Sequence, residues 1–434
     1  MKLNYKRTFF VGLAFMSICA FWQMYDSIIP LILQNTFHLK ETVTGAIMAA
    51  DNVLAVVLLP LLGALSDKAD TPWGRRTPFI VVGTALAVLF LMLIPIADRT
   101  ENMVLFICSL GALLVSMGLY RSPAVALMPD LTPKPMRSQA NAVINLMGAV
   151  GGIYALIMIK ILVGSDSKPD YFPLFLSIGL LMVAAVVVLV LTIREKKLAM
   201  QIAAEYPDEP ETKAEASKQS EAKTKEAKTK LPADVRHSLT FILLSIFFWF
   251  AAYNAVTTAF SRYTQKVWGL EGGGFANCLM VATVAAILSY IPLGALAAKV
   301  GRKKSIFLGL CLMLVSYFAA NFFNAYHGII NVFFALIGVG WAAISVNSLP
   351  MVVEMCSIGD VGRYTGLYYT FSMSAQIMTP ILSGFLLQHI SYRTLFPYAC
   401  IFTVLAMLTM TQVRHGDSKP EKKAKVLENF DVDD

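Results

Sequence analysis

Charged residues are scarce in this chain. Only 15% of its 434 residues are Asp, Glu, Lys or Arg, and 57% are hydrophobic, whereas a soluble domain has about a quarter charged residues. The mean hydropathy is accordingly high, at +0.63. This balance excludes an ordinary soluble domain and predicts a polytopic membrane protein.

Paired cysteines and catalytic motifs are missing as well. No CxxC pair, no histidine pair with metal-ligand spacing and no Walker loop, HExxH or GxSxG motif occurs, and no extramembrane segment is large enough to house catalysis. We therefore expect no disulfides, no zinc site, no resident cofactor and no enzymatic activity. The six cysteines stand singly in apolar segments: Cys19, Cys108, Cys278, Cys311, Cys356 and Cys400.

The net charge of +8 is distributed as membrane topology requires. Lys and Arg lie in short clusters between apolar runs, which indicates positive-inside topology rather than a nucleic-acid partner. With both chain ends inside, the cytoplasmic segments hold about 28 of these residues and the outer loops about seven. We expect a multi-pass protein of the plasma (cell inner) membrane with both termini in the cytoplasm.

Twelve apolar windows are long enough to span a bilayer, which takes roughly 20 residues each. An Ala/Glu/Lys-rich tract with almost nothing to bury separates them into two sets of six. We predict an all-α fold of twelve transmembrane helices in two pseudo-symmetric six-helix bundles, residues 1–194 and 237–413. A charged cytoplasmic linker (195–236) joins them, and a cytoplasmic tail (414–434) follows. The windows are 8–36, 43–66, 77–97, 102–128, 138–163, 171–193, 238–263, 274–298, 304–324, 328–354, 364–389 and 393–413.

The two halves repeat short motifs. Gly63-Ala64-Leu65-Ser66-Asp67-Lys68 matches Gly294-Ala295-Leu296-Ala297-Ala298-Lys299, and Phe21-Trp22 in the first window has an echo in Phe248-Trp249. Two six-helix halves joined by a basic linker are typical of transporters that hold substrate near mid-membrane, between the halves.

The turn Gly63-x-x-x-Asp67 … Gly74-Arg75-Arg76 resembles the loop signature of the major facilitator superfamily. Its ending, Trp73-Gly74-Arg75-Arg76-Thr77-Pro78-Phe79-Ile80, is similar to the glycoside–pentoside–hexuronide:cation symporters and their sucrose/proton relatives. So is the segment from Tyr120-Arg121-Ser122-Pro123 to Arg137-Ser138-Gln139-Ala140-Asn141. The resemblance implies the major facilitator fold and a small-molecule sugar as the substrate. We expect the carrier to be a monomer.

Two acids lie within predicted spans, where a charge costs roughly 2.5–3.5 kcal/mol. Asp26 and Asp51 fall near one depth on antiparallel helices. We predict that they form a proton or cation site; the alternative is a structural carboxylate bonded between helices. Arg121 is their expected partner, as the resemblance also implies, unless it makes a structural pair with Asp51.

Proton coupling is favoured over sodium. Sodium-using members of the resembled family carry a second acid one turn after the first, where this chain has Ala55. A hard cation prefers several oxygen ligands. We therefore predict H⁺ as the coupling ion and keep Na⁺ as the alternative.

Polar and aromatic side chains near mid-membrane are the candidates for binding sugar, although each of them alone is as well explained by packing. In the first half they are Trp22, Gln23, Tyr25, Tyr120, Asn141, Asn145 and Tyr154. In the second half they are Tyr253, Asn254, Trp341, Asn347, Tyr368, Tyr369 and Gln376.

Charged residues at the cytoplasmic helix ends are candidates for a gate whose ion pairs break when the inner face opens. The pairs Asp130/Arg137 and Glu354/Arg363 are expected near Asp67, Arg75 and Arg76. Exposed pairs worth 0–1 kcal/mol are the alternative.

Together these features favour a secondary transporter that takes up a di- or oligosaccharide with protons by alternating access. A multidrug or metabolite efflux antiporter of the same superfamily is the alternative. Its usual Gly-Pro signature in the fifth helix is replaced here by Gly148-Ala149-Val150-Gly151-Gly152.

Overall fold

The computed structural model describes residues 3–133, 136–164, 169–205, 232–355 and 361–417. Within these ranges every regular element is helical, and twelve helices are long and apolar enough to cross a membrane. The predicted all-α fold with twelve spans is confirmed.

The first bundle contains six of these helices, and a short helix follows it. Side-chain oxygens of Asn4 and Asn102 cap the starts of α1 and α4. The six spans are α1 (Tyr5–Asn35), α2 (Glu41–Lys68), α3 (Thr77–Arg99), α4 (Met103–Asp130), α5 (Arg137–Leu162) and α6 (Phe172–Thr192), and α7 (Glu195–Glu205) comes next.

The second bundle repeats this plan. Its longest helix, α9, extends beyond the predicted window 238–263 at both ends, because polar residues continue the helix out of the apolar run. The elements are α9 (Ala233–Val267), α10 (Ala276–Val300), α11 (Arg302–Ala320), α12 (Ile330–Val353), α13 (Val361–His389), η2 (Tyr392–Thr394) and α14 (Leu395–Thr411).

The helix packing shows the pseudo-symmetry directly. In the first bundle α1 packs on α5 and α6, and α4 packs on α2 and α3. In the second bundle α9 packs on α13 and α14, and α12 packs on α10 and α11. Each helix of one bundle therefore has a counterpart with matching neighbours in the other.

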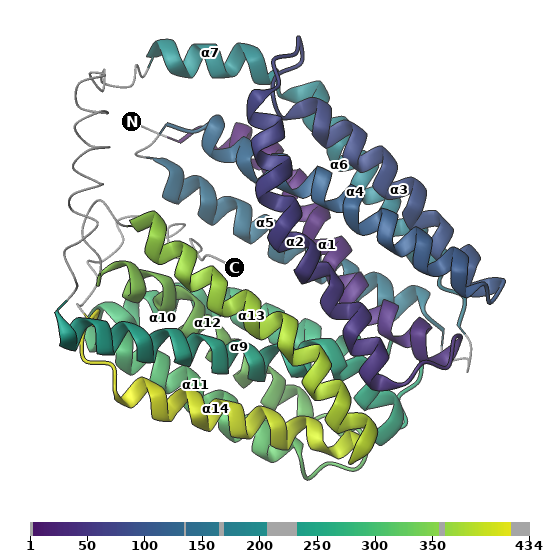
Figure 1. The fold of residues 1–434 in the computed structure, drawn as a ribbon, viewed down its shortest axis with the longest axis vertical. Helices are drawn as coiled ribbons and strands as arrows, with labels where there is room; N and C mark the ends of the chain where they lie inside the picture. The colour runs from purple at the N-terminus through teal and green to yellow at the C-terminus, as the bar shows by residue number, and fades with distance from the viewer. Residues whose placement is uncertain (1–2, 134–135, 165–168, 206–231, 356–360, 418–434) are drawn as a thin grey trace.

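The bundles meet along α1–α9, α2–α13 and α5–α10. We call the end where α1 begins and α14 ends the terminus face, and the opposite end the far face. At the far face the backbones touch: a Cβ on Gly45 of α2 would lie 2.0 Å from the carbonyl oxygen of Pro380 on α13. Figure 1 shows the two bundles converging at this end and spreading apart toward the terminus face.

The start of the linker differs from the solvated segment expected for 195–236. Residues 195–205 form α7 across the terminus face of the first bundle (Figure 1), and Glu195 is only 4% exposed. Residues 206–231 of the predicted linker and most of the predicted tail lie outside the described residues, and the last four residues of the predicted linker already belong to α9.

Candidate functional site

Two acids lie deep in the first bundle. Asp26 is nine residues before the end of α1, and Asp51 is ten residues after the start of α2. At 1.5 Å per residue both lie roughly 14–15 Å from the far face. Their carboxyl groups are close enough to interact electrostatically. The structure thus brings together the two acids that the sequence places at one depth.

Arg121 of α4 lies beside this acid pair. It is within electrostatic range of Asp51, and its Cζ atom is 5.7 Å from the centroid of the Trp22 ring, which is a cation–π geometry. Arg121 and Asp51, both among the described residues, do not form a direct ion pair. Arg121 therefore remains able to engage a ligand or a carboxylate.

Two buried donors at this place have no hydrogen-bond partner among the described residues: the hydroxyl of Tyr25 and the indole nitrogen of Trp22. The two rings contact edge to face at 5.3 Å. Because buried polar groups are nearly always hydrogen-bonded, a water molecule or a ligand is expected to accept from these two donors. We call Trp22, Tyr25, Asp26, Asp51 and Arg121 the charged cluster.

The other first-bundle candidates for binding sugar differ in what their side chains contact. Gln23 is half-buried and donates to Ser27 at 3.3 Å. Tyr154 shares a 2.7 Å hydrogen bond with Ser177 of α6. Asn141 and Asn145 are half-buried one turn apart on α5.

Tyr120 differs from its predicted role in binding sugar. Its ring is fully buried, its hydroxyl lies 2.7 Å from Ser17 Oγ, and it donates to the carbonyl oxygen of Ala14 at 3.0 Å. Both partners belong to α1, so Tyr120 joins α4 to α1 inside the bundle.

The second bundle has an aromatic group within its spans. The rings of Tyr253 on α9 and Trp341 on α12 are stacked, with centroids 3.9 Å apart. Phe250 packs edge-on against the same Trp341 ring at 5.2 Å. The predicted residues Tyr253 and Trp341 are therefore in contact, and Asn254 is half-buried one residue further along α9.

Asn347 is occupied by its own helix, because its side chain is 2% exposed and donates to the carbonyl oxygen of Ala343. On α13, Tyr369 packs edge-on against Tyr368, whose hydroxyl lies 3.1 Å from Ser348 Oγ. Gln376 is half-buried two turns further along α13.

Arg76 organises the terminus face of the first bundle. Its Nε donates to Asp130 at 2.8 Å, and a second guanidinium nitrogen pairs with Asp67. A third donates to Ser66 Oγ at 2.5 Å. Burial lowers the pKa of Arg76, but the hydrogen bond and charge of Asp130 and the charge of Asp67 outweigh it and raise the pKa above the ordinary value. A permanently charged Arg76 thus ties together the ends of α2, α3 and α4.

The other gate candidates pair differently from the prediction. Arg75 is exposed, and Arg137 donates to the backbone carbonyls of Thr132 and Pro129 rather than to Asp130. Glu354 forms an ion pair with Arg302 of α11, while Arg363 is exposed near the start of α13. The ion pairs named here join helices within one bundle and not the two bundles to each other.

Glu195 is a residue that the sequence interpretation missed. Its carboxylate accepts hydrogen bonds from the backbone N–H groups of Arg75, Arg76 and Thr77 and from the Thr77 hydroxyl. It thereby caps α3, where a negative charge is favoured. Gly74 makes room for it: its φ is +118°, and a Cβ would lie 2.3 Å from the carboxylate.

The second bundle repeats this arrangement. Asp417, which follows α14, accepts from the backbone N–H of Lys303 at 2.7 Å beside Gly301. The common signal in the sequence is an acid shortly after the last helix of each half.

A buried ion pair at the far face was also missed. Arg262 of α9 lies 3.0 Å from the carboxylate of Glu41 at the start of α2, and each side chain is 3% exposed. Tyr392 donates to the other Glu41 oxygen at 2.5 Å. A lone arginine inside a predicted span was the signal available for it. These three residues, which we call the far-face lock, hold the two bundles together.

Replacing Glu195 with Gln should lower the stability of the protein. An amide presents one acceptor oxygen and one NH₂ group where the carboxylate accepts four hydrogen bonds, so at least one buried donor loses its partner. We expect a loss of about 1–3 kcal/mol and a lower melting temperature in scanning fluorimetry. Glu271→Gln, at an exposed site, is the control; equal melting temperatures for the two variants would refute the capping role.

The sequence comparisons agree with this fold. The model of the family described as "MFS/sugar transport protein" matches residues 11–395. Sucrose transport protein SUC3 of Arabidopsis thaliana is 27% identical over 151 residues, which cover 30% of this chain and 25% of that protein. Proton-associated sugar transporter A of Homo sapiens is 28% identical over 141 residues, covering 30% and 19% of the two chains. The matched part therefore spans about a quarter or less of these relatives.

Solved structures match over almost the whole chain. A point mutant of the nucleoside transporter NupG superposes with a TM-score of 0.69 at 13% identity, covering 95% of this chain and 100% of that one. The POT family transporter PepTSo superposes with a TM-score of 0.67 at 12% identity, covering 95% and 98%. At such identities the likeness establishes the fold alone. The family model covers far more than half of the sequence, and the chain therefore belongs to the MFS/sugar transport protein family.

Proposed function

We propose that this protein takes up a di- or oligosaccharide together with protons by alternating access, acting as a monomer. One observation carries the proposal: Asp26 and Asp51 lie at one depth within the spans, in electrostatic range of each other, and Asp51 is also in range of Arg121. Acids at this depth are costly and are typical of ion and proton pathways. The family and the names of the sucrose-transporting relatives support a sugar as the substrate.

The charged cluster can couple the two fluxes. A carboxylate changes its affinity for a proton when its solvation and neighbouring charges change. Rocking of the bundles alters the solvation of Asp51, because α2 packs against α13 of the other bundle. Arg121 belongs to the same bundle as Asp51, so its charge stays within range of this carboxylate during the movement. Proton binding on one side and release on the other would then accompany the conformational change.

The contacts between the bundles support an assignment of the conformational state. The far-face lock joins them at one end, and the ion pairs named at the terminus face stay within single bundles. We assign the terminus face to the cytoplasm of the plasma membrane, by the distribution of Lys and Arg. The structure then represents the inward-open state, and outward opening requires the lock to break.

We assign sugar contacts to both bundles. The buried donors of Trp22 and Tyr25, which lack a partner among the described residues, suit sugar hydroxyls, and the stacked Tyr253–Trp341 pair offers a flat apolar face. Trp341→Ala should raise the KM for sugar roughly threefold to tenfold, since aromatic contacts contribute about 0.5–1.5 kcal/mol. Trp341→Phe should retain most of the affinity and Phe322→Ala, at an exposed site, all of it; an unchanged KM for Trp341→Ala would remove this pair from the site.

Uptake into proteoliposomes tests the proposal. Radiolabelled sucrose and maltose should accumulate under an imposed pH gradient, and a sodium gradient alone should not drive them. Accumulation with sodium at uniform pH would replace the proton by Na⁺ as the coupling ion. Expulsion of a drug or metabolite in exchange for protons, without sugar uptake, would establish the efflux antiporter instead.

A further inference from the structure

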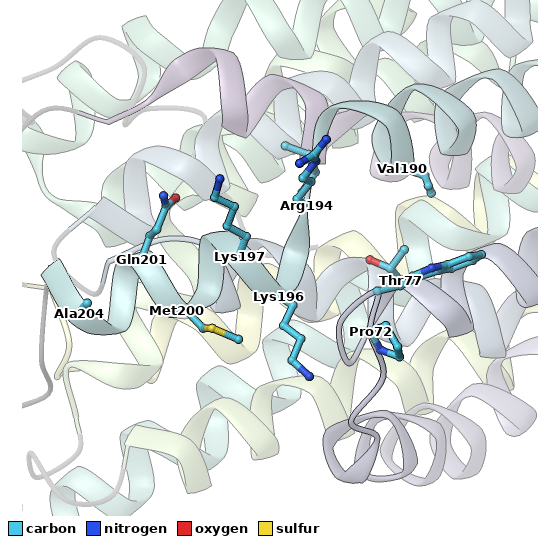
Figure 2. A pocket seen from close by; sticks show the side chains of 11 residues that line it. Pro72, Thr77, Val190, Arg194, Lys196, Lys197, Met200, Gln201 and Ala204 are labelled. Carbon is cyan, nitrogen blue, oxygen red and sulfur yellow. The ribbon is translucent and has the colours of Figure 1, made fainter.

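A cavity of about 730 Å³ opens at the terminus face, outside the charged cluster and independent of the proposed function. It lies between α7, the end of α6 and the turn before α3 (Figure 2). Its walls combine apolar and basic side chains. The apolar ones are Trp73, Val190, Ile193 and Met200, and the basic ones are Arg194, Lys196 and Lys197.

The wall formed by α7 is fixed to the bundle. Glu195 caps α3, Lys196 pairs with Asp70 at 2.8 Å, and Leu198 and Ile202 pack against the hydrophobic core. Lys197, Gln201 and Ala204 follow one another at helical spacing and line the cavity. The cavity is therefore a built feature of the first bundle.

Its position is the edge of the membrane. The span of α6 ends at Thr192 and that of α3 begins at Thr77, so the cavity lies at the level of lipid headgroups. Trp73 is 62% exposed there, and Leu191 on the adjoining turn of α6 is 77% exposed. An exposed tryptophan at this level is typical of a membrane–water interface, and the exposed Leu191 suits contact with an acyl chain.

The charges in the cavity are unbalanced. Lys196 has Asp70, and the carboxylate of Glu195 is turned to the backbone of α3. Arg194 and Lys197 have no acidic partner among the described residues that line or adjoin the cavity. Two such cations and an apolar wall in one cavity are complementary to an amphiphile with an anionic head group.

We propose that this cavity binds an anionic phospholipid of the leaflet at the terminus face. Arg194 and Lys197 hold the phosphate, Gln201 donates to the headgroup, and Trp73, Val190 and Met200 contact the first part of an acyl chain. The same turn carries Arg76, so the lipid would adjoin the ion pairs that Arg76 forms with Asp67 and Asp130.

Native mass spectrometry and thermal unfolding of the full-length detergent-solubilised protein test this site. Phosphatidylglycerol should remain bound and raise the melting temperature, because a ligand of the native state stabilises it. Phosphatidylcholine with the same acyl chains should do so much less. The double variant Arg194→Gln/Lys197→Gln should lower retention of phosphatidylglycerol by roughly tenfold or more, since each basic residue near an anionic lipid surface contributes severalfold.

Two further variants make the test specific. Lys299→Gln/Lys304→Gln removes the same charge from exposed positions at the terminus face of the second bundle and should retain the lipid. Gln201→Glu keeps the shape of the cavity but adds a negative charge, and should weaken binding. Equal retention by the cavity variants and the control would overturn the proposal. So would equal binding of the two lipids, or displacement of the lipid by inorganic phosphate alone, which would indicate a site for a soluble anion.

Discussion

Replacing Asp51 with Asn should abolish the accumulation of sugar against its gradient, with a loss of at least about tenfold under an imposed pH gradient. The amide has the shape of the carboxyl group and can still accept from the backbone N–H of Asn52, which donates to Asp51 at 2.6 Å. It cannot bind and release a proton. Sugar exchange at equal pH, measured as counterflow, should persist, because it does not need net proton movement.

Two variants make this result specific. Asp26→Asn should share the defect in accumulation, since the two carboxyl groups interact. Asp234→Asn, at an acid whose side chain is 68% exposed at the start of α9, should transport like the parent protein. If Asp51→Asn still accumulates sugar in response to the pH gradient, the carboxylate does not couple the fluxes.

Breaking the far-face lock should shift the protein toward the outward-open state. Glu41→Gln leaves Arg262 buried without its counter-charge, and loss of one partner of a buried pair costs about 3–5 kcal/mol. Because the pair joins the bundles, this cost applies only while the far face is closed. A shift of that size is enough to turn a minor conformer into the major one.

Spin labels on opposite bundles can measure the shift. Labels at the exposed positions Thr100 and Asn324 of the far-face loops should give longer distances in Glu41→Gln than in the parent protein. The double variant Glu41→Gln/Arg262→Gln should recover part of the closed population, because neither charge remains.

A matched control is Arg99→Gln, which breaks an exposed far-face pair with Asp170 inside the first bundle and should change nothing. An unchanged distance distribution in Glu41→Gln would mean that the lock does not set the equilibrium.

The sequence predicts features that depend on one helix or one turn. Apolar length places the spans to within a few residues, and helical rise places Asp26 and Asp51 at one depth. The turn motif places Asp67, Arg75 and Arg76 together at one end of the bundle, but it does not predict that Arg76 is the residue that pairs with Asp67. These properties are local, so they require no knowledge of which helices touch.

Long-range contacts could not be predicted in this way. Glu41 looks like an ordinary acid in the first turn of a helix, and its partner Arg262 belongs to the other half of the chain. Tyr120 and Asn347 look like ligands for a sugar because they are polar residues in apolar helices. The hydrogen bond of Tyr120 to Ala14 depends on the packing of α4 on α1. That of Asn347 to Ala343, four residues earlier in the same helix, depends on the side-chain rotamer, and the sequence pattern contains neither.

Glu195 is an intermediate case. Its neighbours in the sequence are charged, which predicts a solvated segment. In the structure its carboxylate instead accepts the backbone hydrogen bonds at the start of α3. Only the folded position of α6 brings it to that site.

The most direct test of the account is the movement of protons caused by sugar. Proteoliposomes containing a trapped pH indicator, held at equal pH on both sides, should acidify inside when sucrose or maltose is added outside. Asp51→Asn should show no acidification while still exchanging sugar. Entry of sugar into vesicles of the parent protein without any change of internal pH would contradict proton-coupled transport.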